Sequence, residues 1–165
     1  MADRRDSVLV LGWGNPLRGD DGVSARVLDA LRDTSGDEEV RLELKQVHQL
    51  APELSETVAQ FRGVVFVDAR AGGTPGEVSC EDVAPGEGRA TLSHSLSPEA
   101  LLLYANRLYG HAPAAALVTI GGRSFDHGTD LGPEVSRAVP KAARKVRGLA
   151  RFWAHESLLP KPAGA

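Results

Sequence analysis

A strand, a glycine-rich loop and the start of a helix follow one another in residues 8–22, and this stretch constrains the fold more than any other. Its sequence is VLVLGWGNPLRGDDG. The apolar run that opens it is typical of a strand buried on both faces of a sheet. Gly12 and Gly14 permit a sharp turn, and Asp20 and Asp21 stand directly before an apolar helical pattern. Two carboxylates are therefore predicted at the carboxyl end of a buried strand, where open α/β sheets build their sites.

A glycine-rich loop between a strand and a helix also occurs in nucleotide-binding proteins, so this alternative was weighed. The glycines at positions 12, 14 and 19 match neither the dinucleotide fingerprint nor the P-loop, and no Lys-Ser or Lys-Thr follows them. Asp20 and Asp21 occupy the place of a pyrophosphate at the helix N-terminus and would repel it. The paired carboxylates favour a cation or a water molecule as the target of this loop.

The remaining periodicity predicts an α/β fold with a mainly parallel sheet of about five strands. Strands and helices are expected in the order β-α-β-α-β-β-α-β-α, which implies a three-layer sandwich with helices on both faces and one antiparallel edge strand. The first strand would lie inside the sheet. The expected strands are 8–11, 40–47, 64–67, 77–83 and 115–120, and the expected helices begin near 23, 52, 98 and 133, the last interrupted at Pro140.

Composition excludes several classes of protein. With 165 residues the chain is expected to form one domain, 1–155, followed by a disordered tail, 156–165. The net charge of −3 gives no reason to expect nucleic acid as a partner. No apolar run is long enough for a membrane span, and the N-terminus lacks a signal-peptide core, so a cytoplasmic location is expected. Cys80, the single cysteine, excludes an internal disulfide, and its position within a strand favours a small packed residue.

Three acidic or imidazole side chains are expected to converge at one edge of the sheet. Asp21 precedes the first helix, Asp68 ends a buried strand, and His94 stands in the loop before the third helix. Two carboxylates and one imidazole leave room for water or a substrate atom on a divalent metal. Spacing alone leaves simpler roles open, because Asp68 suits a strand-end turn and His94 a surface or capping position. His48, at another strand end, is a further candidate for lining the site.

Four stretches of the chain, from about Ser7 to Leu149, resemble the hydrogenase maturation proteases. These endopeptidases trim the C-terminal extension of the large subunit of nickel–iron hydrogenases. The landmarks are LGWGNPLRGDDGV (11–23), VVFVDAR (64–70), SHSLSPEALL (93–102) and LVTIGGRSFDHGTDLGPEV (117–135). The chain departs from members of the family that have a glycine-rich turn where HQLAPEL (48–54) stands here, which leaves the substrate preference open.

The resemblance implies a set of site residues and a substrate. Asp21, Asp68 and His94 fall on the family's acidic, aspartate and histidine metal ligands, while Asn15 and Asp20 match the surrounding loop as candidates for lining the site, without a ligand role. The metal would be nickel already held by the hydrogenase large-subunit precursor, with no organic cofactor and no nucleic acid or membrane partner. Either the metal or a carboxylate, Asp20 or Asp68, would activate the water. A non-catalytic metal-binding chaperone with the same ligands is the main alternative.

Overall fold

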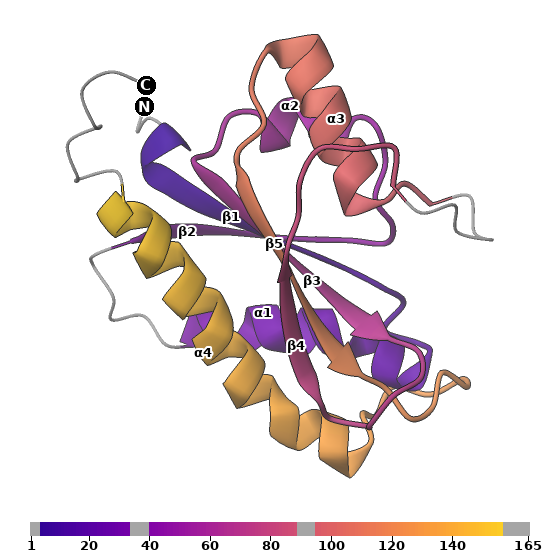
Figure 1. Cartoon of the computed structure of the whole chain (residues 1–165). Helices are drawn as coiled ribbons and strands as arrows, with labels where there is room; N and C mark the ends of the chain where they lie inside the picture. Colours follow the sequence, from indigo (N-terminus) through magenta and orange to yellow (C-terminus); the bar gives the residue numbers. More distant parts are fainter. Residues whose placement is uncertain (1–3, 34–39, 89–94, 157–165) are drawn as a thin grey trace.

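The computed structural model describes residues 4–33, 40–88 and 95–156. The elements occur in the predicted order, with a short 3-10 helix before the first strand and another before the first helix (Figure 1). They are η1 (Arg4–Asp6), β1 (Ser7–Trp13), η2 (Gly19–Gly22), α1 (Val23–Asp33), β2 (Arg41–Val47), α2 (Leu54–Val58), β3 (Gly63–Arg70), β4 (Val78–Asp82), α3 (Pro98–Tyr109), β5 (Ala114–Gly121) and α4 (Pro133–Glu156).

The five strands form one sheet in the order β2-β1-β3-β5-β4. β1 pairs in parallel with β2 and β3, and β3 pairs in parallel with β5. β4 runs antiparallel to β5 at the edge. The predicted α/β class, the antiparallel edge strand and the interior position of the first strand are all confirmed. β1 and β3 are apolar throughout their first halves because a helix layer covers them on each face.

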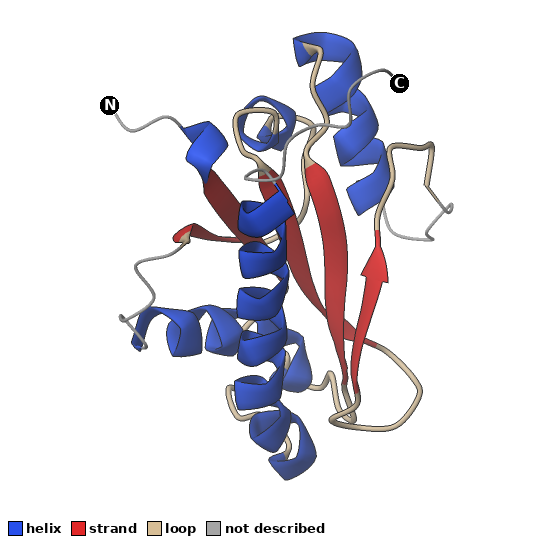
Figure 2. Ribbon diagram, turned by 60° about the vertical axis from the view of Figure 1, so that its left-hand side comes forward, coloured by secondary structure: helices blue, strands red, loops and turns tan. Residues whose placement is uncertain are grey.

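The helices cover the two faces of the sheet in pairs (Figure 2). α1 and α4 pack on one face, with alternate residues of β1 and β3 such as Val8, Val10 and Val65 beneath them. α2 and α3 pack on the other, over Leu9, Leu11 and the intervening residues of β3. Successive side chains of a strand point to opposite faces, so the even or odd position of a residue along its strand (its strand parity) decides which helix layer it packs against. Among the described residues no helix is long and apolar enough to cross a membrane.

Two helices differ from the prediction in their apolar faces or length. α2 is a short helix, although Leu54, Val58 and Phe61, whose spacing predicts one apolar helical face, are all buried. The chain tightens after Val58, where the Phe61 N–H donates to the Val58 carbonyl at 3.2 Å and turns the ring into the core. In α3, the spacing of the apolar residues predicts one buried face made of Leu101, Tyr104, Ala105 and Leu108. Leu101 and Ala105 are buried, but Tyr104 and Leu108 are 40% and 66% exposed.

The predicted interruption at Pro140 is wrong, because α4 continues through it. Pro140 cannot donate to the carbonyl four residues earlier, so the helix loses one hydrogen bond there. Buried residues on both sides, including Val135, Ala138, Ala142 and Val146, hold the two halves against the sheet. Packing of one continuous apolar face therefore outweighs the loss of one helical bond.

Replacing Pro140 by Ala is expected to raise the free energy of unfolding by about 1–3 kcal/mol, because alanine restores the missing donor on an exposed helical position. Urea denaturation measures this change. Pro133→Ala serves as the control, since a proline in the first turn of a helix lacks no helical bond and its replacement is expected to have little effect. A Pro140→Ala protein no more stable than the parent would contradict this account of α4.

Candidate functional site

The loop after β1 holds Asp21 at the carboxyl end of the sheet. The backbone N–H of Asn15 donates to Asp21 Oδ2 at 2.6 Å, and Asn15 Oδ1 accepts from the Leu17 N–H at 2.9 Å. Gly14 has φ +139°, and a Cβ atom there would overlap the Asp21 carbonyl oxygen. Glycine is therefore required at this position for both conformation and space. The loop fixes one carboxylate oxygen of Asp21 and uses the amide of Asn15 to shape its own turn.

Asp20, next to Asp21, has a different environment, since its side chain is only 1% exposed. Its Oδ2 accepts hydrogen bonds from the N–H groups of Arg123 and Ser124 at 2.7 and 3.0 Å, and its Oδ1 accepts from the Gly132 N–H at 2.7 Å. These donors lie in the loop after β5, in the fourth landmark of the sequence. Asp20 thus joins the loop after β1 to the loop after β5.

These hydrogen bonds govern the acidity of Asp20. Burial acts to raise its pKa, but the three backbone N–H groups, together with the nearby Arg123 charge, bring the pKa below the usual value of 3.8. Asp20 is consequently an ionised acceptor with both oxygens engaged. It neither lines an open site nor has a free oxygen with which to take a proton from water. The sequence missed this role, and the only signal for it was the pairing of two carboxylates before one helix.

Asp68 lies within β3 rather than after it, since β3 continues to Arg70. Its neighbours are set by strand register. Thr119 of β5 is its partner, and Trp13 follows the β1 residue paired with Val67, so Trp13 stands beside Asp68 on the face covered by α2 and α3. The indole of Trp13 also meets the ring of Phe66 edge-on, with centroids 6.0 Å apart. A carboxylate in this row is surrounded mainly by apolar groups.

The surroundings of Asp68 raise its pKa from 3.8 to about 7. Burial is the largest cause, because it removes water from the charged form; the Ala69 N–H opposes this, and the negative charge of Asp21 adds to the rise. No ion pair among the described residues includes Asp21 or Asp68. Arg70, two residues along β3, is bound to Glu77 at 2.6 Å and to Ser79 at 2.7 Å. The two carboxylates therefore repel each other, and no ion pair within the described part of the chain neutralises them.

Such a pair can do two things chemically. At neutral pH Asp68 exchanges a proton readily, which suits a general acid or base. A divalent cation placed between Asp21 and Asp68 would relieve their repulsion and displace the proton of Asp68. The arrangement therefore suits either proton transfer or cation binding.

The two histidines of the predicted site differ in what the structure describes of them. His94 lies outside the described residues, so its convergence with Asp21 and Asp68 stays a prediction. Within the described ranges no group of three or more histidine, cysteine or acidic side chains is arranged to hold a metal. His48 follows β2 and is exposed, on the same carboxyl edge of the sheet as Trp13, whose strand partner is Val47.

Comparison with solved structures identifies the class of protein that has this fold. No protein-family model matches the chain, and no curated protein matches its sequence significantly. Solved structures do match over most of the chain, and the fold is that of hydrogenase maturation endopeptidases.

Three similar structures illustrate the match. The hydrogenase maturating endopeptidase HybD from E. coli has 24% identity and a TM-score of 0.71, with 88% of this chain and 93% of that chain covered. The NiFe hydrogenase maturation protease HycI from Thermococcus kodakarensis has 23% identity and a TM-score of 0.69 over the same shares. The hydrogenase 2 maturation peptidase of a Thaumarchaeota archaeon has 24% identity and a TM-score of 0.62, covering 88% and 99%. The resemblance stated from the sequence is thus confirmed at the level of fold.

Proposed function

We propose that this protein is an endopeptidase that removes the C-terminal extension of a nickel-loaded hydrogenase large-subunit precursor. One observation carries the proposal: Asp21 and Asp68, neither of which forms an ion pair with a described residue, repel each other at the carboxyl edge of a sheet that has the fold of hydrogenase maturation endopeptidases. Carboxyl edges of open α/β sheets are the usual location of their sites. The reaction is assigned to the cytoplasm.

In this proposal Asp21, Asp68 and His94 bind the nickel that the precursor already holds. Carboxylate and imidazole are suitable ligands for a borderline divalent cation. Because the pKa of Asp68 is about 7, roughly half of the free protein carries a proton there at neutral pH. Arrival of nickel releases that proton. The nickel is thus part of the substrate, and its positive charge recruits a precursor that is ready for cleavage.

The water that attacks the peptide bond is activated by the nickel or by Asp68. Asp20 does not serve as the base, because both of its oxygens accept backbone N–H groups. Asp20 instead joins the loop after β1 to the loop after β5. Asn15 contributes the N–H that fixes Asp21. His48, exposed after β2, contacts the precursor in this proposal.

The source of the metal is tested by a two-by-two experiment. Protease treated with nickel or with a chelator is mixed with nickel-loaded or nickel-free precursor, and cleavage is followed by gel mobility and mass. We expect cleavage of the nickel-loaded precursor by both protease samples and no cleavage of the nickel-free precursor by either. Efficient cleavage of nickel-free precursor by nickel-treated protease would make the protein a conventional metalloprotease. A stable complex without cleavage would make it a metal-binding chaperone.

A further inference from the structure

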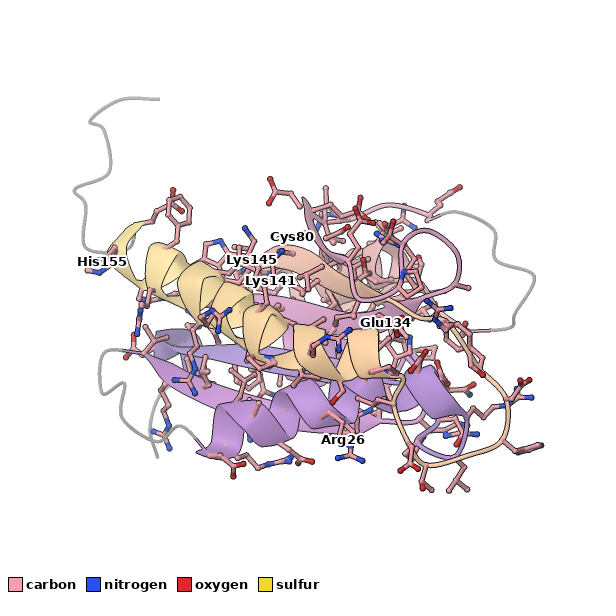
Figure 3. The ribbon with its side chains drawn as sticks, turned by 90° about the horizontal axis from the view of Figure 1, so that it is seen from below. Arg26, Cys80, Glu134, Lys141, Lys145 and His155 are labelled. Atoms are coloured by element: carbon pink, nitrogen blue, oxygen red, sulfur yellow. The ribbon has the colours of Figure 1, made fainter. Side chains whose placement is uncertain are left out.

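A groove separates the edge strand β4 from the exposed side of α4, on the face of the sheet that α1 and α4 cover. Its volume is about 420 Å³, and its lining comes from these two elements alone: Val78, Ser79 and Cys80 of β4, and Lys141, Arg144 and Lys145 of α4. Figure 3 shows Cys80 beside Lys141 and Lys145. The sequence favoured a packed Cys80, but the residue is exposed, because β4 is the last strand of the sheet.

The α4 side of this groove is basic. Lys141, Arg144 and Lys145 are spaced three and four residues apart, so they occupy one face of the helix. All three are exposed, and none forms an ion pair with a described residue. A solvated basic face is the simplest account of such residues, but here the three charges stand over one groove. The groove therefore favours an anionic occupant.

The β4 side presents unpaired backbone groups. The Gly121 N–H donates to the Glu77 carbonyl at 2.9 Å, and the Val83 N–H donates to the Ala115 carbonyl at 3.0 Å. In an antiparallel ladder, residues alternate between facing the partner strand and facing away from it. Odd-numbered residues of β4 thus bond to β5. The outward-facing N–H and carbonyl groups belong to Val78, Cys80 and Asp82.

The side chains of β4 that alternate with Glu81 and the basic residues of α4 lie on the same face of the sheet. Val78 packs against the core beneath α1 and α4, so Cys80 and Asp82, which share its strand parity, also point to the α4 face. Glu81 points to the opposite face. A strand added to β4 would have every second side chain directed toward the lysines and the arginine. Asp82, at the end of β4, is the one carboxylate of the strand on this side.

We propose that the β4 edge binds an extended peptide segment of a partner protein, with acidic side chains at alternate positions. The backbone of the segment pairs with Val78, Cys80 and Asp82, and its carboxylates face Lys141, Arg144 and Lys145. Strand addition of this kind takes affinity from main-chain hydrogen bonds and specificity from alternate side chains. This surface is independent of the proposed cleavage site and uses none of its residues.

A second copy of the chain is a poorer occupant of the same edge. Two β4 strands that pair antiparallel form a continuous sheet, which places both α4 helices on the same face. Two identical rows of three cations would then approach each other across the junction. Like charges repel, whereas an acidic segment neutralises them. Charge thus favours a heterologous acidic strand over self-association.

Binding is tested with a short fluorescein-labelled peptide of alternating threonine and glutamate, with a threonine–lysine peptide as its counterpart. Fluorescence anisotropy at low and high salt measures the affinity. We expect binding of the acidic peptide only, weakened by salt. Hydrogen exchange followed by NMR should show new protection of the Cys80 and Asp82 amides. Binding of both peptides equally, or of neither, would overturn the proposal.

Two pairs of variants separate strand addition from simple charge attraction. Cys80→Pro removes an outward-facing N–H, which an edge strand tolerates, whereas Cys80→Ala keeps it. We expect loss of binding in the first and normal binding in the second. The double variant Lys141→Glu/Lys145→Glu should weaken binding about tenfold or more, while Lys45→Glu/Arg107→Glu, on other surfaces, should change it little.

Urea denaturation confirms that each variant is folded. Normal binding by folded Cys80→Pro, or dimerisation of the free protein through this edge in sedimentation experiments, would overturn the proposal.

Discussion

Asp68→Asn is expected to reduce cleavage of a nickel-loaded hydrogenase large-subunit precursor by about 10²–10⁴-fold. Asparagine keeps the shape of the side chain but removes the negative charge and the titratable proton on which the proposed metal binding and proton transfer depend. The measurement is the single-turnover rate of release of the C-terminal extension. Asp33→Asn, at the exposed end of α1, is the matched control and should cleave at the parent rate. A rate for Asp68→Asn within a few-fold of the parent would remove Asp68 from the site.

The same substitution is expected to stabilise the metal-free protein. Burial and Asp21 raise the pKa of Asp68 to about 7, so the unfolded chain binds fewer protons at this site than the folded protein. The stability of the parent protein therefore falls as pH rises from about 4 to 7 and stays low above that. Asp68→Asn removes this cost, on the order of 4 kcal/mol at pH 8, since the pKa rises by about three units and one unit corresponds to about 1.4 kcal/mol.

Stability and activity thus change in opposite directions, which separates a functional Asp68 from a structural one. Urea denaturation at pH 4 and pH 8, in the presence of a chelator, measures the stability change. The gain should be large at pH 8 and nearly absent at pH 4. A protein destabilised by Asp68→Asn at pH 8 would show that the carboxylate has a stabilising partner.

Asp20→Ala is expected to lower the free energy of unfolding by on the order of 3–5 kcal/mol at pH 7. The substitution leaves three backbone N–H groups, of Arg123, Ser124 and Gly132, without their acceptor. Asp20→Asn keeps one acceptor oxygen and should lose less. Urea denaturation measures the change, and hydrogen exchange should show faster exchange of the three amides.

The pH dependence of this loss has the opposite sign to that of Asp68. The folded-state pKa of Asp20 lies below the usual 3.8, so its contribution is present above about pH 4 and disappears as pH falls through the folded-state value. The deficit of Asp20→Ala should therefore shrink in acid. Asp126→Ala, an exposed position in the loop after β5, is the control. A loss no larger than that of the control would show that Asp20 does not join the two loops.

The local pattern of apolar and polar residues was sufficient to predict the order of the elements and the arrangement of the sheet. β1 and β3 contain the continuous apolar runs 8–11 and 64–67, and such runs are stable in a sheet only with helices on both faces. A parallel sheet with right-handed crossovers then leaves few topologies. Alternation marked β4 as an edge strand, because only one side of it meets the core. These features depend on neighbours close in sequence, which is why the sequence by itself determined them.

Predictions from the same local signals were wrong where packing between distant parts of the chain decides the structure. Pro140 breaks an isolated helix, but the apolar face of α4 spans it and holds both halves on the sheet. Cysteine is usually a buried residue, but Cys80 is exposed because β4 is the edge strand of the described sheet. Local propensity is worth about 1 kcal/mol per residue, and burial of several side chains exceeds it.

The different surroundings of Asp20 and Asp21 were decided by tertiary structure. The local pattern shows only two adjacent carboxylates before one helix, and the family resemblance alone distinguished them. The fold brings the loop after β5 onto Asp20, where three N–H groups fix its charge, and brings Asp68 of β3 close to Asp21, where no ion pair with a described residue neutralises them. Residues more than a hundred positions away supply the first environment. Electrostatic surroundings depend on distance in space, so only the tertiary structure surrounds one aspartate with three N–H donors and places the other beside a second carboxylate.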